Sequence, residues 1–204
     1  LTASIAGDLI SAGLNNNLLA EELSPSLTRL ERSLCNWFAA RLGMPNASGG
    51  VAASGGTLSN LMALVVARKV AGLQSDPTAV VFASEDSHIS LTKSIEVMGL
   101  PPTALKKIET NYKGEMSIDF LSNQISQLKE NGRKIFAIVA TAGTTVRGAV
   151  DPLLKLAELC RNEGIWLHVD GAIGGIFALS DTTSGVVHGI SLADSITLNP
   201  QKVL

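Results

Sequence analysis

Two short segments of the sequence place reactive side chains directly after strand-like stretches. In HVDGAIGG, residues 168–175, Asp170 follows the run WLHV; in DSITLNPQK, residues 194–202, Lys202 follows a second such run. A lysine amine forms an imine with an aldehyde, and a carboxylate beside a pyridine nitrogen keeps that nitrogen protonated. This pair at neighbouring strand ends is what pyridoxal 5'-phosphate (PLP) requires. Taken singly, Asp170 also fits a turn cap and Lys202 an ordinary surface lysine.

A third segment, SGGTLSN at residues 54–60, has the composition of a phosphate cradle. Gly55 and Gly56 let the backbone approach an anion closely, and Thr57 adds a hydroxyl. The residues that follow predict a helix, whose N-terminal amides and dipole favour a phosphate. The segment is neither a Walker loop nor GxGxxG, and a plain glycine turn capped by Thr57 is the alternative.

Several further side chains are predicted to complete such a site. Asn199 and Gln201 flank the proline before Lys202 and can donate hydrogen bonds to phosphate oxygens. The small Ala172 can lie against one face of a flat ring. His88, in SEDSH, can stack on a ring, although a lone histidine is more often structural. Thr145, in TAGTT, follows the most apolar strand and is the favoured contact of that loop, with simple turn chemistry as the alternative.

The elements that must position these residues alternate between strand and helix. Helices are expected over 2–14, from a start at Ser24 to about Gly43, and over 57–70, 89–98, 117–130 and 153–164; strands are expected over 79–83, 104–109, 134–143, 166–169 and 193–198. Residues 49–53 fit a short strand or turn. Repeated strand–helix units with continuous apolar strands predict an α/β fold, with a mostly parallel sheet and helices on both faces.

Composition excludes several functional classes. The chain has 204 residues, 46% hydrophobic and 17% charged, and a formal net charge of −2. The absence of a basic tract argues against nucleic-acid binding. No apolar run is long enough for a membrane span, and no metal-ligand spacing is present. Two distant cysteines predict a reduced, cytoplasmic protein. The apolar pattern at both ends predicts native sequence beyond residues 1 and 204.

These motifs resemble the group II PLP-dependent amino-acid decarboxylases, which include glutamate, aromatic L-amino-acid, cysteine sulfinate and diaminobutyrate decarboxylases. The matching segments, in order, are ELSPSLTRLE, SGGTLSNLMALVVAR, SEDSH, TAGTTVRGAVDP, HVDGAIGG and DSITLNPQK. The resemblance covers nearly the whole chain. It implies the large domain of the aspartate aminotransferase fold (fold type I), with residues 1–45 as an N-terminal helical segment and 46–204 as a PLP-binding domain that lacks the small C-terminal domain.

The resemblance also implies roles for individual residues. Lys202 would form the Schiff base with PLP, Asp170 would pair with its ring nitrogen, and Ala172 and His88 would cover its two faces. The phosphate would bind the group Gly56, Thr57, Asn199 and Gln201. Thr145 would contact the cofactor near its ring or the imine. Asp151 would be structural or would support a residue that contacts the cofactor. The family usually has NPHK where this chain has NPQK, and Gln201 cannot act as an acid or base.

The implied activity is decarboxylation of an L-amino acid to the amine and CO2 by a homodimer with its site at the subunit interface. The GTTVRGAVDP loop is more similar to that of the glutamate, cysteine sulfinate and diaminobutyrate decarboxylases, which favours an acidic or diamino substrate. Two alternatives remain open. One is another fold type I enzyme, such as a cysteine desulfurase, an aminotransferase or a carbon–carbon lyase. The other is a noncatalytic PLP-binding homologue or fragment, and residues 1–204 alone are expected to show little turnover.

Overall fold

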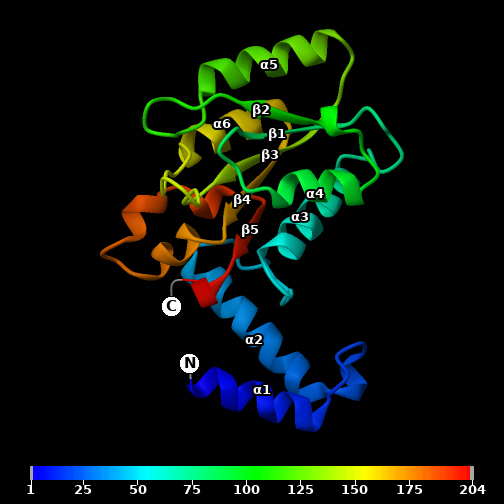
Figure 1. Ribbon diagram of the computed structural model, residues 1–204, viewed down its shortest axis with the longest axis vertical. Coiled ribbons are helices and arrows are strands. Elements are labelled where there is room, and N and C mark those ends of the chain that lie inside the picture. The colour runs from blue at the N-terminus through cyan, green and yellow to red at the C-terminus, as the bar shows by residue number, and fades with distance from the viewer. Residues whose placement is uncertain (1, 203–204) are drawn as a thin grey trace. The chain divides into compact units, whose positions relative to one another are not determined.

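A computed structural model describes residues 2–202 of the chain, which divides into two compact units after Ala52 (Figure 1). The first unit contains two helices and one short 3-10 turn: α1 (Thr2–Leu14), Glu21–Leu23 and α2 (Pro25–Arg41). Ser24 precedes α2 at the predicted N-cap, and Pro25 opens the helix. The Ser24 hydroxyl makes no capping bond; instead the Thr28 hydroxyl donates to the Ser24 carbonyl at 2.9 Å.

The second unit is built on a five-stranded parallel sheet, as the apolar runs predict. Its strands are β1 (Val80–Ser84), β2 (Leu105–Ile108), β3 (Ile135–Thr141), β4 (Trp166–Gly171) and β5 (Ser195–Leu198). They are arranged in the order β2-β1-β3-β4-β5, and every neighbouring pair is parallel. From β1 the chain adds β2 on one side and then crosses back to add β3, β4 and β5 on the other side, so the strand order reverses between β1 and β3. Such a reversal opens a crevice at the carboxyl ends of the strands.

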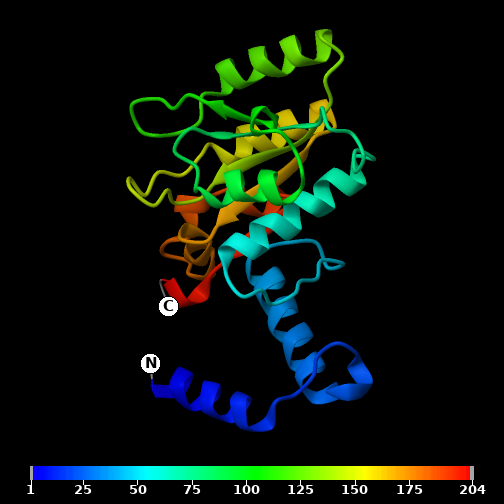
Figure 2. The same cartoon turned by 45° about the vertical axis from the view of Figure 1, so that its right-hand side comes forward.

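Four helices cover this sheet: α3 (Gly56–Val70), α4 (Ser90–Val97), α5 (Ile118–Glu130) and α6 (Leu153–Glu163). Crossover connections between parallel strands are right-handed. The β1–α4–β2 connection runs across the sheet in the direction opposite to the connections that contain α5 and α6, so α4 lies on the opposite face of the sheet. Figures 1 and 2 show α3 and α4 side by side on one face, with α5 and α6 on the other. The helix-covered parallel sheet predicted from sequence is confirmed.

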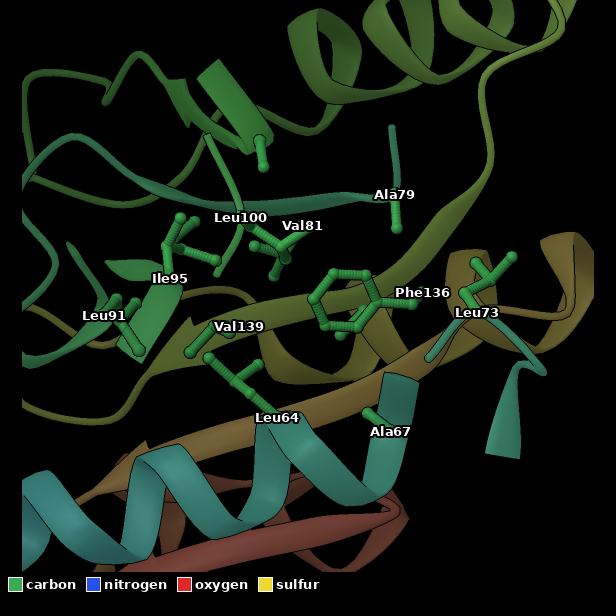
Figure 3. Packing of buried hydrophobic residues seen from close by; sticks show 13 residues of the cluster. Leu64, Ala67, Leu73, Ala79, Val81, Leu91, Ile95, Leu100, Phe136 and Val139 are labelled. Carbon is green, nitrogen blue, oxygen red and sulfur yellow. The ribbon is translucent and has the colours of Figure 1, made fainter. Parts of the chain in front are cut away.

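A cluster of buried hydrophobic residues lies between the sheet and the α3–α4 layer (Figure 3). Leu64 of α3 and Leu91 of α4 are fully buried there, against Val81 of β1 and Val139 of β3. This packing fixes the height of α3 on the sheet. It also fixes the position of the first turn of α3, from which the glycine segment extends.

Strand register brings three polar residues level with one another at the carboxyl end of the sheet. Thr141 of β3 pairs with Asp170 of β4, which pairs with Thr197 of β5. The Ser59 hydroxyl, in the first turn of α3, lies 2.9 Å from the Thr197 hydroxyl. The start of α3 is thereby attached to the strand ends that carry the candidate site.

One segment differs in detail from the expectations. Residues 49–53 form no strand and run as irregular chain into the glycine segment. The stretch between β4 and β5, for which no element was predicted, folds into three 3-10 turns, Gly174–Leu179, Ser184–Val187 and Ile190–Leu192. Two more 3-10 turns lie at Pro102–Ala104 and Pro200–Lys202. Such short turns depend on packing rather than on a repeating apolar pattern.

Candidate active site

A cavity of about 290 Å³ opens at the carboxyl ends of the strands, close to the lower limit of ordinary ligand pockets, roughly 300 Å³. Its walls come from the start of α3 and from the segments that follow β1, β3, β4 and β5. The lining residues are Gly56, Thr57, Asn60, Asp86, His88, Thr141, Gly143, Thr144, Thr145, Asp170, Ala172, Ile173, Asn199 and Lys202. Eight of the nine residues that the resemblance assigns to the cofactor therefore surround one cavity, and Gln201 is the exception.

Asp170 is the buried carboxylate of this cavity, only 5% exposed. Its Oδ2 accepts a hydrogen bond from the Asn60 side-chain amide at 2.7 Å, and its Oδ1 accepts from the Ala172 backbone N–H at 3.1 Å. Both oxygens thus have a donor on the protein side, which orients the carboxylate. The carboxylate is held at the wall of a cavity that a cationic ring nitrogen could enter.

His168, two residues before Asp170, is fully buried and does not line the cavity. Its Nε2 lies 3.1 Å from the Asn60 Oδ1, and its Nδ1 lies 2.9 Å from the Ser195 hydroxyl. Burial lowers the pKa of this imidazole to about 4, against the opposing effect of the nearby Asp170. The ring is therefore neutral at physiological pH.

Lys202 lies on the 3-10 turn Pro200–Lys202 that directly follows β5. Its backbone N–H donates to the Asn199 carbonyl at 3.2 Å, which turns the chain back towards the cavity. Lys202 and Asn199 both line the cavity. Gln201 between them is exposed and does not line it, so the structure does not bring this predicted phosphate ligand to the cavity wall.

The start of α3 supplies the anion-binding geometry that the glycine segment predicts. Gly55 occupies the N-cap position without any side-chain cap, and the first N–H groups of a helix have no partner within the helix. Gly56 and Thr57 line the cavity at this point. A Cβ on Gly56 would lie 3.4 Å from the Ala172 Cβ, in van der Waals contact, so glycine leaves this space between the two residues open. A phosphate at this position would meet the positive end of the helix dipole.

The loops after β1 and β3 form the opposite wall. His88 is exposed at the cavity, and its Nδ1 accepts from the Ser90 backbone N–H at 3.2 Å, which leaves Nε2 available. Thr144 and Thr145 both line the cavity. The Thr144 hydroxyl is already used, because it accepts from the Ala149 N–H at 3.1 Å. Thr145 is exposed, which suits the role that sequence reasoning gave it over its neighbour.

Sequence reasoning missed four polar lining residues that the fold brings to the cavity, Asn60, Asp86, Thr141 and Thr144. Asn60 stands one turn inside α3, at i+4 from Gly56, so helical spacing was the available signal. Thr141 ends β3, and Asp86 follows β1 within SEDSH. Asp86 Oδ2 and the Thr141 hydroxyl are buried without a hydrogen-bond partner. Arg147 approaches Asp86 at 3.7 Å as an ion pair at the rim.

Asp151 has the structural placement that was expected. Its two carboxylate oxygens accept the backbone N–H groups of Met116 and Thr141, each at 2.7 Å, and its backbone N–H donates to the Thr141 carbonyl. Asp151 is 3% exposed, and this burial raises the pKa of its carboxyl from 3.8 to about 6 despite the two hydrogen bonds. The Asp151 carboxylate therefore holds the end of β3 through its hydrogen bond to Thr141, while its burial disfavours the charged form.

This raised pKa predicts a pH dependence of stability. Because the folded state holds the Asp151 proton more tightly, its contribution is complete below about pH 4 and is lost as pH rises through about 6. We expect the unfolding free energy of the wild type, minus that of Asp151→Asn, to fall by about 3 kcal/mol across this range. Urea titrations at several pH values measure the difference. A flat difference would contradict the prediction, and the contribution of His168 cancels between the two proteins.

The residues that line the cavity fit PLP in their chemistry. One wall offers the buried Asp170 carboxylate for a ring nitrogen, and another offers the uncapped N-terminus of α3 for a phosphate. The Lys202 amine stands at the end of β5 for an aldehyde. Among residues 2–202 no cluster of His, Cys, Asp and Glu is suited to a metal ion. No helix in the same range is long and apolar enough to cross a membrane.

Comparison with known proteins points to one family. Residues 2–204 match the family model described as the pyridoxal-dependent decarboxylase conserved domain. The chain is 38% identical over 201 residues to an aromatic-L-amino-acid decarboxylase of Bacillus atrophaeus, and 36% identical over 208 residues to a cysteine sulfinic acid decarboxylase of Rattus norvegicus. Each match covers 98% of this chain and 42% of the relative.

Solved structures agree with these matches. The crystal structure of mouse CSAD in its apo form superposes with a TM-score of 0.91 at 33% identity, covering 98% of this chain and 43% of that one. The chain thus spans less than half the length of the relatives it matches, and the expectation of a PLP family with this fold is confirmed. The protein belongs to the pyridoxal-dependent decarboxylase family.

Proposed function

We propose that the complete protein decarboxylates an L-amino acid with PLP held in this cavity. The observation that carries the proposal is one cavity that combines the buried Asp170 carboxylate, the Lys202 amine and the uncapped start of α3. When bound, PLP supplies an electron sink for the pair released as the carboxylate leaves. The family membership supports decarboxylation as the bond that is broken.

Each residue of the cavity would have its own role in this reaction. Asp170 would keep a proton on the ring nitrogen, because its two oxygens are fixed by Asn60 and Ala172 and cannot turn away. Lys202 would attach the cofactor and release it to the substrate amine. Gly56, Thr57 and Asn199 would hold the phosphate, and Ala172 and His88 would bound the ring on its two sides. Thr145 would contact the cofactor from the β3 loop.

The substrate class is proposed as amino acids with an acidic or diamino side chain. The cavity lining contains two carboxylates, Asp86 and Asp170, and one amine, Lys202. If Asp170 pairs with the ring nitrogen and Lys202 with the aldehyde, Asp86 and its ion-pair partner Arg147 are the remaining charges, and they offer a charged partner to a diamino or an acidic side chain. A panel of diamino, acidic and aromatic amino acids assayed for CO2 release tests this preference.

The complete protein is proposed to act as a cytoplasmic homodimer. In the first unit, α1 buries none of its residues, and its large apolar side chains are Ile5, Leu9, Ile10 and Leu14. An apolar helix surface of this kind favours a protein partner. Analytical ultracentrifugation of the complete protein tests the assembly, and a monomer at micromolar concentration would contradict it.

Trapping the cofactor on Lys202 tests the proposed function directly. The complete protein is incubated with PLP, reduced with borohydride and digested, and the peptide that carries the added mass is identified. We expect the label on Lys202 and none in Lys202→Ala, with CO2 release in the variant reduced at least 10³-fold because the nucleophile is lost. Lys155→Ala, outside the cavity on α6, is the matched control and should label normally.

The outcomes of this experiment separate the alternatives. A label on another lysine, or none on a folded wild type saturated with PLP, would overturn the proposal. A label on Lys202 with formation of a keto acid or a persulfide in place of CO2 would identify another fold type I reaction. A label without turnover of any amino acid in the complete protein would identify a noncatalytic PLP-binding homologue.

A further inference from the structure

A chain of hydrogen bonds runs behind the cavity wall and ends on Asp170. The Trp166 indole N–H lies 2.8 Å from the Ser195 hydroxyl, which lies 2.9 Å from the His168 Nδ1. The His168 Nε2 lies 3.1 Å from the Asn60 Oδ1, and the Asn60 Nδ2 lies 2.7 Å from the Asp170 Oδ2. His168 and Asn60 are buried, at 0% and 1% exposed.

The Asp170 end sets the direction of this chain. A carboxylate oxygen accepts, so the Asn60 Nδ2 donates to it and the Asn60 Oδ1 accepts from the His168 Nε2. Turning the Asn60 amide over would place its oxygen 2.7 Å from the Asp170 oxygen, with two acceptors facing each other. In a neutral imidazole the Nδ1 then carries no proton and accepts from the Ser195 hydroxyl, which itself accepts from the Trp166 indole. The Ser195 carbonyl, 3.2 Å from the same Nδ1, receives no proton in this arrangement.

We infer that Asn60 is a positioning residue for Asp170: its amide joins the Trp166–Ser195–His168 chain to the carboxylate and holds it facing the cavity. The inference rests on the proposed PLP function for its consequence, because a carboxylate fixed in this direction is what would pair with a protonated pyridine nitrogen. Asn60 is suited to the task since its second amide proton is occupied by the Ser90 hydroxyl at 3.0 Å. The side chain is therefore held by three partners and cannot rotate freely.

The substitution Asn60→Asp tests the inference with almost no change of shape. The new carboxylate can still accept from His168, but in its charged form it repels Asp170, and the two carboxyl groups would share one proton and leave less negative charge on Asp170. We expect the dissociation constant for PLP, measured by fluorescence on the complete apo protein, to rise on the order of 10–100-fold. An unchanged dissociation constant in folded Asn60→Asp would overturn the inference.

Ser90→Ala is the matched control, because it removes another buried partner of Asn60 and leaves the Asp170 contact in place. Its dissociation constant for PLP is expected to stay within about threefold of wild type. If Ser90→Ala raises the dissociation constant for PLP as much as Asn60→Asp does, the role of Asn60 is only structural. Thermal melting of both variants reports the loss of packing separately.

A second measurement does not depend on PLP. Long-range ¹H–¹⁵N NMR spectra of the histidine-labelled apo protein at neutral pH report which ring nitrogen of His168 carries the proton, with His168→Gln for assignment. We expect the proton on Nε2. A proton on Nδ1 would overturn the proposed direction of the chain. If wild type binds no PLP, the proposed function fails, while this spectrum still decides the hydrogen-bond chain.

Discussion

Replacing Asp170 with Asn is expected to lower the turnover number of the complete protein by at least about 10²–10³-fold, the usual cost of removing one fixed electrostatic group from a site. The carboxylate loses its charge, so nothing keeps the ring nitrogen protonated during bond breaking. The new amide also conflicts with its surroundings, since the Asn60 amide and the Ala172 N–H both need acceptors. The rate of CO2 release from the preferred amino acid measures the effect.

The Asp194→Asn substitution provides the control for this experiment. Asp194 is an exposed carboxylate that accepts the Leu167 N–H at 2.7 Å, and it does not line the cavity. The same chemical change there should leave turnover within about threefold of wild type, because the charge is outside the site and screened by solvent. Asp170→Asn with near-normal turnover would show that Asp170 does not act on the cofactor nitrogen.

Replacing Leu64 with Ala is expected to lower the free energy of unfolding by about 2–5 kcal/mol. Leu64 is fully buried in the cluster between α3 and the sheet (Figure 3), where the neighbouring side chains cannot all collapse into the space left behind. PLP affinity should fall as well, because the first turn of α3 is held at the cavity by this packing and by the Ser59–Thr197 contact. Urea denaturation and a PLP titration measure the two effects.

Leu58→Ala on the same helix is the comparison variant. Leu58 is 40% exposed, so the same truncation there removes less buried surface and should cost under about 1 kcal/mol. Equal losses for the two variants would mean that α3 is not anchored through Leu64. If Leu64→Ala weakens PLP binding without lowering the free energy of unfolding, the substitution acts on the cavity and not on the packing of the core.

Most of the secondary structure and most of the cavity lining could be predicted from the chain alone. Strands buried on both faces appear as continuous apolar runs, such as the residues of β3, and helices carry a repeating apolar pattern. In a parallel sheet all carboxyl ends meet at one edge, so residues that follow strands, such as His88, Thr145, Asp170 and Lys202, are expected to come together. The structure places all four around one cavity.

Other features depended on contacts between elements that are distant in sequence. Asn60 and His168 are 108 residues apart and are brought together only when α3 packs across β4. Gln201 and Lys202 are neighbours in sequence, yet the 3-10 turn after β5 brings Lys202 to the cavity and leaves Gln201 in solvent. The sequence alone therefore determined the class of fold and the reactive groups. Tertiary packing decided their partners and protonation, because burial and hydrogen bonding are set by groups that the local sequence does not contain.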